Sequence, residues 1–478
     1  MKFRGSEYII IKIMEKNNEK ITTICISTCN RPKQLQLSLS SLIDHLEKYN
    51  RSPRILIVDD SEDLQNAQQS KEIVSSYSPK YKGEIEFMDR NDRKNMASKI
   101  AEKKNIPEEV MNFALCGDKV SSITLGSSHN TFLLKTQGEK ILIIDDDVVY
   151  RFFSPIKEEL PFFSIENLNE YWFLKDKETP PTSLFKTVEV DLLSVHESML
   201  GKKASEILGE DTPDYIKDLE IIDTYMGAYG DSPMESHIPL LLLPQVRKKL
   251  KNISLEEYKM IKETRRIIQT PLSPTVYQGV MCISMIMGVD NRGLTPPFMP
   301  IGRGHDLVFG TTRYTAFPSK LSAYIPLLIE HKRPGKEARP VAYDSIYEFT
   351  KMSRVTASFI NEIEDIEIEP KENLQIIGNK FINIAKEPEP SFVRIMEAQC
   401  QKITRAIINH INNIIANSSG MPDFWINDMK SITSALGSPD PKLFMADIIK
   451  NHREDRMVIL QKWMNLYGQL LQEWHKLF

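Results

Sequence analysis

"KILIIDDDVVY", residues 140–150, leads an apolar run directly into three adjacent carboxylates, Asp145, Asp146 and Asp147. Residues 140–144 are typical of a buried strand. A surface loop could carry such a cluster by accident, and a single Asp could cap a helix. Three carboxylates at a partly buried strand end repel one another, however, and a divalent cation removes that repulsion. In an extended D-x-D the first and third side chains point the same way, so we expect Asp145 and Asp147 to bind one Mn²⁺ or Mg²⁺ ion.

Short β-rich runs alternate with helical runs around this strand. Strands are predicted at 21–27, 54–58 and 85–88, and helices at 32–49 and 131–137. Continuous apolar strands separated by helices indicate a mostly parallel sheet covered on both faces, which is an α/β fold. Ligands bind beyond the carboxyl ends of such strands, where Asp59 and Asp60 follow the strand at 54–58. For these two residues a capping role and a ligand-binding role both stay open.

The composition excludes some classes of protein. The chain has 478 residues, of which 41% are hydrophobic, so it can form two or three domains. Charged residues make up 26% and the net charge is −4, which gives no reason to expect the concentrated basic face that binds nucleic acid. No apolar run approaches the roughly 20 residues that cross a bilayer, so we expect no transmembrane segment. Five cysteines form a sparse, odd set that indicates a reducing cytoplasm. Peripheral attachment to the inner face of the membrane stays open.

The patterns divide the chain into three parts. We expect an N-terminal extension (1–20), an α/β domain (21–335) with a polar insertion at about 89–122, and an all-helical C-terminal region (336–478) that follows a linker around 331–340. The C-terminal region carries two apolar stripes at helical spacing, which we expect to be buried as core. Whether they are buried within one chain or between chains of an oligomer stays open.

Four segments together resemble a known enzyme family. They are "TICISTCNRPKQLQLSLSSL" (23–42), "ILIVDDSED" (55–63), "LGSSHNTFLLKTQGEKILIIDDD" (125–147) and "PPFMPIGRGHDLVFG" (296–310). In this order they resemble glycosyltransferase family 2 and its relatives of the GT-A fold, over roughly residues 21–335. The resemblance implies a Rossmann-like catalytic domain that binds a nucleotide sugar, with a UDP-sugar favoured.

The resemblance also implies roles for single residues. Asp306 would be the catalytic base, and Asp145 and Asp147 the metal-binding D-x-D pair. The nucleotide sugar would be bound by Thr28, Asn30, Arg31, Asp60 or Asp59, Asn130, Asp145 and Asp146. His305 stands where most relatives have Glu, which puts the acceptor chemistry in doubt. Some relatives complete the metal site with a His beyond the base; for His331, a ligand role and a capping role stay open.

The predicted function is a metal-dependent, inverting transfer of a sugar to a hydroxyl of a glycan, peptide or small-molecule acceptor. Asp231, Tyr277 and His305 are candidates for the acceptor site, with Tyr225 and Tyr229, although turn or core roles stay open for them. One competing hypothesis is a nucleotidyltransferase, although no Gly-rich loop follows the first strand. Another is a non-catalytic binding or scaffold protein built on a decayed transferase domain.

Overall fold

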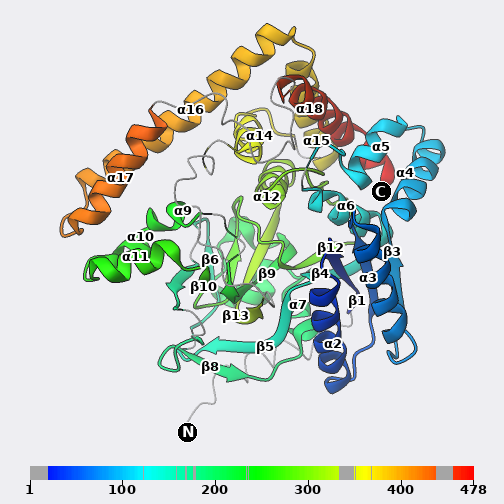
Figure 1. The fold of residues 1–478 in the computed structure, drawn as a ribbon, viewed down its shortest axis with the longest axis horizontal. Coiled ribbons are helices and arrows are strands. Elements are labelled where there is room, and N and C mark those ends of the chain that lie inside the picture. The colour runs from blue at the N-terminus through cyan, green and yellow to red at the C-terminus, as the bar shows by residue number, and fades with distance from the viewer. Residues whose placement is uncertain are drawn as a thin grey trace.

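In the computed structural model, four parallel strands form the N-terminal part of one large sheet (Figure 1). β1 (Ile21–Thr28) lies between β2 (Arg54–Asp59) and β4 (Glu139–Asp145), and β3 (Ile85–Met88) pairs with the outer side of β2. All four strands confirm the positions predicted from the sequence. Because they are parallel, their carboxyl ends meet at one edge, where Thr28 is in register with Asp59, and Ser27 with Asp145.

The structure describes residues 20–478 except 122, 158, 167–168, 176–178, 233, 235, 333–348, 350, 368 and 438–455. The predicted N-terminal extension lies outside the described residues apart from Lys20, and so does most of the predicted linker.

The sheet continues beyond β4 through strands from the middle of the chain. The order is β3-β2-β1-β4-β12-β9-β13-β11-β6, with β12 (Ile286–Asn291) antiparallel to both β4 and β9, and with β9 and β13 parallel to each other. The other bounds are β5 (Val148–Pro155), β6 (Phe162–Ser164), β7 (Glu170–Phe173), β8 (Phe185–Val188), β9 (Glu220–Asp231), β10 (Arg266–Thr270), β11 (Thr275–Tyr277) and β13 (Lys320–His331). The chain is a mixed α/β protein with a mostly parallel central sheet, as the sequence predicts.

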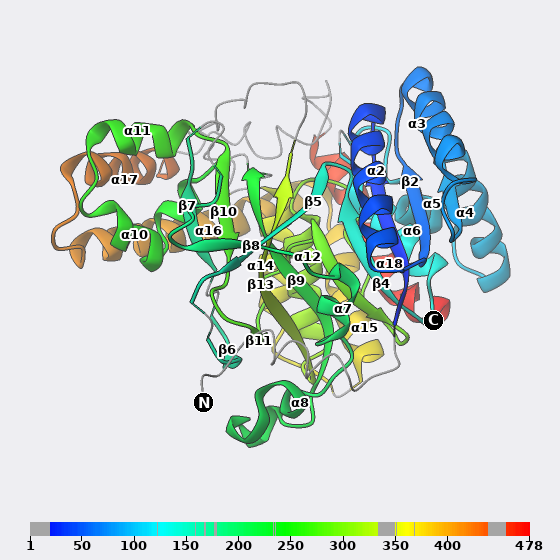
Figure 2. The same ribbon diagram turned by 90° about the horizontal axis from the view of Figure 1, so that it is seen from below.

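Helices cover both faces of the sheet. Along β4, Ile141 and Ile143 join one hydrophobic core while Leu142 and Ile144 join another, because successive side chains of a strand point to opposite faces. α2 (Pro32–Lys48) and α3 (Leu64–Tyr77) run side by side over one face (Figure 2), and α6 (Leu125–Lys135) covers the other. α7 (Leu192–Glu197) and α8 (Ala204–Leu208) join the core of α2, and α12 (His305–Ala316) joins that of α6.

The segment predicted as a polar insertion at about 89–122 contains two packed helices between residues 90 and 116. α4 (Arg90–Lys104) begins at a capping box in which Asp89 and Asp92 each accept a backbone N–H of the other, and it ends at Asn105 in the left-handed conformation. α5 (Glu108–Cys116) packs against it. Both helices bury one side in the core of α6, while most charged residues of α4, apart from the buried Arg93, face solvent.

The C-terminal part of the described chain is helical: α14 (Met352–Asn361), α15 (Pro370–Ala385), α16 (Glu389–Ala416), α17 (Asp423–Leu436) and α18 (Arg456–Glu473). α18 packs against α15 and α5, whereas α16 reaches away to α17, which lies beside α10 (Pro244–Leu250) and α11 (Leu255–Glu263), near the short α9 (Ile238–Leu241) (Figure 1). These helices therefore share hydrophobic cores with the α/β part. None of the described helices has the length and apolar character that crossing a membrane requires.

α15 and α18 approach each other through two glycines. A Cβ on Gly468 would lie 2.7 Å from the Gly378 carbonyl oxygen, so backbone would have to move. We expect Gly468→Val to lower the free energy of unfolding by about 1–3 kcal/mol, because overpacking forces the helices apart. Urea denaturation measures the change. Gly293→Val is the matched control, since no atom lies within 4 Å of a Cβ there; an equal loss in both variants would contradict the close crossing.

Candidate metal centre

The turn between β4 and β5 brings the acidic cluster to His331. The N–H of Asp145 donates to the Met285 carbonyl oxygen at 3.0 Å, and the Asp147 carbonyl oxygen accepts from the N–H of Lys332 at 2.8 Å. β5 then pairs antiparallel with β13, with His331 opposite Val148. Because Val148 directly follows Asp147, this register places the imidazole beside the third carboxylate.

Asp145, Asp147 and His331 form a group with the geometry of a metal site. Each offers one ligand atom, and these atoms lie within 4.8 Å of one another; no other group of three such residues is found in the part of the chain that the structure describes. Asp147 Oδ1 lies 2.7 Å from His331 Nε2, with both side chains 2% exposed, while Asp145 is half-buried. Ligands about 2.1 Å from one ion lie roughly 3–4.2 Å apart, so a Mg²⁺ or Mn²⁺ ion fits after small side-chain rotations.

A backbone contact fixes the orientation of His331. Its Nδ1 contacts the main-chain oxygen of Asp231, which as an acceptor requires a proton on Nδ1 and leaves Nε2 to face Asp147. Gly230 makes this approach feasible, since its φ is +117° and a Cβ would lie 2.1 Å from the His331 carbonyl oxygen. Sequence reasoning missed Gly230, although a lone glycine inside a strand pattern signals close backbone approach.

The middle carboxylate has a different role from its neighbours. Asp146 is fully buried, accepts a hydrogen bond from Thr28 Oγ1 at 2.6 Å and pairs with Arg31 at 2.8 Å. Arg31 also pairs with Asp147 at 2.8 Å. Asp146 therefore holds the loop after β1 against the end of β4. Its predicted contact with the nucleotide sugar stays a prediction, and both of its oxygens already have partners in the protein.

Protons or a divalent cation can balance the charges of the cluster. Burial, together with Asp147, raises the pKa of Asp145 to about 7, and burial also raises that of Asp146 to about 7. Burial opposes the charged form of His331, yet Asp147 and Asp145 raise its pKa to about 9. With His331 neutral, three carboxylates, one guanidinium and one divalent cation carry no net charge. The donor set thus fits a hard divalent ion.

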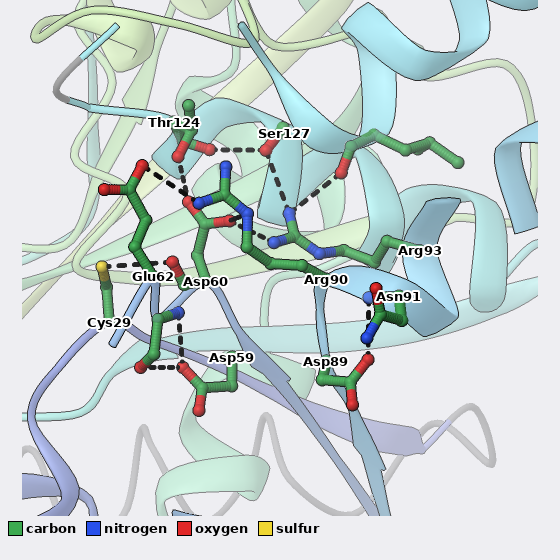
Figure 3. A network of polar contacts seen from close by, with 12 residues as sticks. Cys29, Asp59, Asp60, Glu62, Asp89, Arg90, Asn91, Arg93, Thr124 and Ser127 are labelled. Atoms are coloured by element: carbon green, nitrogen blue, oxygen red, sulfur yellow. Dashed lines mark hydrogen bonds and ion pairs between the residues drawn. The ribbon is translucent and has the colours of Figure 1, made fainter. Parts of the chain in front are cut away.

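Asp59 and Asp60, the predicted base-binding pair, lie at the end of β2 with different partners (Figure 3). Asp60 contacts Arg93 and Thr124 and lies 3.4 Å from Arg90, so both of its oxygens are occupied. Asp59 accepts from the N–H and the hydroxyl of Ser61 at 2.8 and 2.5 Å. Burial raises the pKa of Asp59. Contact of either residue with a base stays a prediction.

Arg93 is a site residue that sequence reasoning missed. It is fully buried and also donates to the Leu115 carbonyl oxygen at 2.9 Å and to Ser127 at 3.1 Å (Figure 3). The available signal was the four-residue spacing of Arg93, Ala97 and Ala101, which puts a basic residue on the small-residue face of α4.

The two predicted asparagines support loops. Asn30 has φ +54° and links the loop after β1 to Ser61, whose hydroxyl oxygen accepts its N–H at 2.7 Å. Asn130 is fully buried; its amide donates to the carbonyl oxygens of Ala114 and Phe298 at 3.1 and 3.0 Å and accepts the Phe298 N–H at 2.8 Å. Asn130 thus shapes the segment that leads to Asp306, and its predicted contact with the donor sugar stays a prediction.

Asp306 lies half-exposed in the first turn of α12, and two contacts tie this helix to the strand that ends at Asp145. His305 Nε2 is 3.3 Å from Ser284 Oγ, and the next residue, Met285, accepts the N–H of Asp145. Burial lowers the pKa of His305, so its ring is neutral at neutral pH. Residues 284–285 thus connect the helix of Asp306 to the strand that ends at Asp145, and the catalytic role of Asp306 stays a prediction.

The candidate acceptor residues other than His305 are mostly buried. Tyr225, Tyr229 and Tyr277 are 0%, 1% and 4% exposed, and the Tyr277 hydroxyl accepts from the Met281 N–H at 3.4 Å. The Asp231 carboxylate lies 3.4 Å from Arg265. The structure places these residues in the core or beside His331, and their contact with an acceptor stays a prediction.

Comparison with protein-family models and with curated proteins finds no match for this chain. The chemistry of the site therefore rests on its own residues and their geometry.

Metal binding should release a proton from His331. Because the pKa of His331 is about 9, the ring is protonated at neutral pH and must lose a proton to bind an ion. We expect Mn²⁺ to release about one proton at about pH 7.5, and its affinity to rise with pH until about 9. Below about pH 7 the dependence should steepen, since Asp145 then also carries a proton. Calorimetry in two buffers of different ionisation enthalpy measures the release.

His331→Gln and His410→Gln form a matched pair for this measurement. His410 lies exposed on α16, so its variant should bind Mn²⁺ like the wild type, whereas His331→Gln should bind at least about tenfold more weakly. Mn²⁺ binding without proton release would exclude His331 as a ligand.

Proposed function

We propose that this chain is a metal-dependent glycosyltransferase of the GT-A fold that moves a sugar from a nucleoside-diphosphate sugar, UDP-sugars being favoured, to an acceptor hydroxyl. The observation that carries the proposal is the joining of Asp145, Asp147 and His331 to the helix of Asp306 through residues 284–285. The mostly parallel sheet, with acidic residues at the ends of β2 and β4, supports it because ligands bind at that edge.

The residues divide the chemistry between them. Asp145, Asp147 and His331 would hold the cation, which when bound neutralises the charge of a departing diphosphate. Arg31 is 36% exposed, so it can also contact an anionic ligand while it pairs with Asp146 and Asp147. Its positive charge next to the carboxylates reduces the repulsion that a diphosphate would meet.

Asp306 would remove the proton of the acceptor hydroxyl as that oxygen attacks the anomeric carbon. Its side chain lies half-exposed in the first turn of α12. A single base that activates the acceptor implies inversion, since a retaining double displacement needs a second carboxylate as nucleophile. The neutral His305 beside it adds no negative charge to the acceptor side, unlike the Glu of most relatives.

Loss of the base should lower turnover without preventing metal binding. We expect Asp306→Asn to reduce kcat by about 10²–10⁴-fold while Mn²⁺ affinity stays unchanged, because Asn cannot take a proton. Release of nucleoside diphosphate from a panel of nucleotide sugars, with Mn²⁺ and with a chelator, measures turnover. The matched control is Asp423→Asn, which changes another Asp in the first turn of a helix, on the remote α17, and should leave kcat unchanged.

The same assay separates the competing functions. Release of pyrophosphate from a nucleoside triphosphate and a sugar phosphate would indicate a nucleotidyltransferase instead. Mn²⁺ binding with no turnover of any donor, and no difference between Asp306→Asn and wild type, would indicate a non-catalytic binding protein.

A further inference from the structure

The C-terminal helix α18 is bonded to a loop at the edge of the candidate site. Trp463 on α18 is fully buried, and its indole N–H donates to Asp118 Oδ2 at 2.9 Å. Asp118 begins the loop that joins α5 to α6. A buried indole N–H that meets a carboxylate forms a charge-assisted hydrogen bond, which fixes the geometry of both groups.

The same aspartate folds the first part of this loop. Its other oxygen, Oδ1, accepts the N–H of Val120 at 3.0 Å, and its carbonyl oxygen accepts the N–H of Ser121 at 3.0 Å. The Asp118 side chain therefore connects α18 directly to the turn at residues 118–121.

The far end of the loop contacts both parts of the candidate site. Thr124 donates its hydroxyl to Asp60, at the end of β2. The carbonyl oxygen of Ile123 accepts the N–H of Gly302 at 2.9 Å, four residues before Asp306. The loop thus runs from α18 to the predicted nucleotide side and to the segment that carries the candidate base.

The first turn of α6, directly after this loop, packs against the 299–304 segment with no space between the two backbones. A Cβ on Gly126 would lie 1.9 Å from the Met299 carbonyl oxygen, and the N–H of Ser127 donates to the Pro300 carbonyl oxygen at 3.2 Å. Backbone in direct contact with backbone transmits a displacement, because close-packed interiors are not compressible.

We propose that Trp463 is a positioning residue for the nucleotide-sugar site, and that α18 is in this way part of the donor side of the active site. The proposal rests on the proposed function. Through Asp118, Trp463 holds the turn at residues 118–121, which positions Ile123 and Thr124 for their contacts with Gly302 and Asp60. The C-terminal region then contributes to donor binding by positioning this loop, and it does not itself contact the substrate.

Contacts along the rest of the C-terminus keep α18 in this place. Trp474 Nε1 donates to the Thr295 carbonyl oxygen at 2.5 Å, and Lys104 donates to the Lys476 carbonyl oxygen at 2.7 Å. Lys462, next to Trp463, pairs with Glu109 on α5 at 2.9 Å. A helix held at several points can serve as a fixed support for a loop.

Matched tryptophan variants test the proposal. Trp463→Phe keeps a buried ring but removes the N–H that Asp118 accepts. Trp425→Phe makes the same change at a fully buried tryptophan of α17 whose N–H has no partner among the described residues. Asp118→Ala removes the acceptor, whereas Asp118→Asn keeps one acceptor oxygen for the indole N–H.

Binding of UDP in the presence of Mn²⁺, followed by calorimetry, is the first measurement. We expect Trp463→Phe and Asp118→Ala each to weaken the binding of UDP about tenfold, because each removes the charge-assisted hydrogen bond between Trp463 and Asp118. Trp425→Phe should bind UDP like the wild type, and Asp118→Asn close to it. The Trp463→Phe, Asp118→Ala double variant should bind UDP no more weakly than Asp118→Ala alone, because that single change already removes the bond to Trp463. Mn²⁺ affinity without UDP should not change.

Hydrogen exchange of residues 118–121 and 300–306 is the second measurement and needs no ligand. We expect both segments to exchange faster in Trp463→Phe than in Trp425→Phe, since loss of the anchor loosens them together. Equal exchange and equal UDP affinity in the two variants would overturn the proposal and leave Trp463 as a core residue only.

Wild-type protein that binds neither UDP nor another nucleoside diphosphate would instead overturn the proposed function. Faster exchange in Trp463→Phe would then still confirm the link from α18 to the segment that carries Asp306.

Discussion

The mutual repulsion of three adjacent carboxylates at the end of β4 is the constraint on which the site depends. Basic side chains from two parts of the sheet compensate this repulsion. Arg31 comes from the loop after β1, the parallel neighbour of β4, and His331 comes from the end of β13, which pairs with β5. The turn at Asp146 and Asp147 therefore joins the N-terminal strands to the later part of the sheet by ion pairs, which hold both halves of the site in place.

The two outer carboxylates and the middle one perform separate tasks because the turn points them apart. Both oxygens of Asp146 bind Thr28 and Arg31. Asp145, Asp147 and His331 instead bring one ligand atom each to within 4.8 Å of one another. An Asp147–His331 pair that shares a proton in the buried site is well suited to exchange that proton for a metal ion, since ligands must be deprotonated to bind. Consecutive residues can thus take a structural role, at Asp146, and the proposed metal-binding role, at Asp145 and Asp147.

The sequence predicts the N-terminal strands well, and it indicates that Asp145 and Asp147 lie close together, because both are local patterns. Alternation of apolar runs identifies β1, β2 and β4, and the same alternation indicates where their acidic ends meet. The partners of those acids were harder to predict. Arg93 reaches Asp60 from a stretch that reads as polar surface, and His331 reaches Asp147 only through the register of β5 with β13. Long-range register does not follow from periodicity.

The helical C-terminal region shows the same limit. Its apolar stripes predicted buried faces correctly, but periodicity reveals which face is buried and not what covers it. On the 28-residue α16, Met396 enters the core of α5 and α18, whereas Ile411 and Ile414, on the same stripe, enter the core of α10, α11 and α17. The continuous apolar stripe of α16 therefore packs into two cores and connects them. A helix that spans two cores fixes their separation, and α18, packed in the first of them, is held rigidly enough to support a loop of the site.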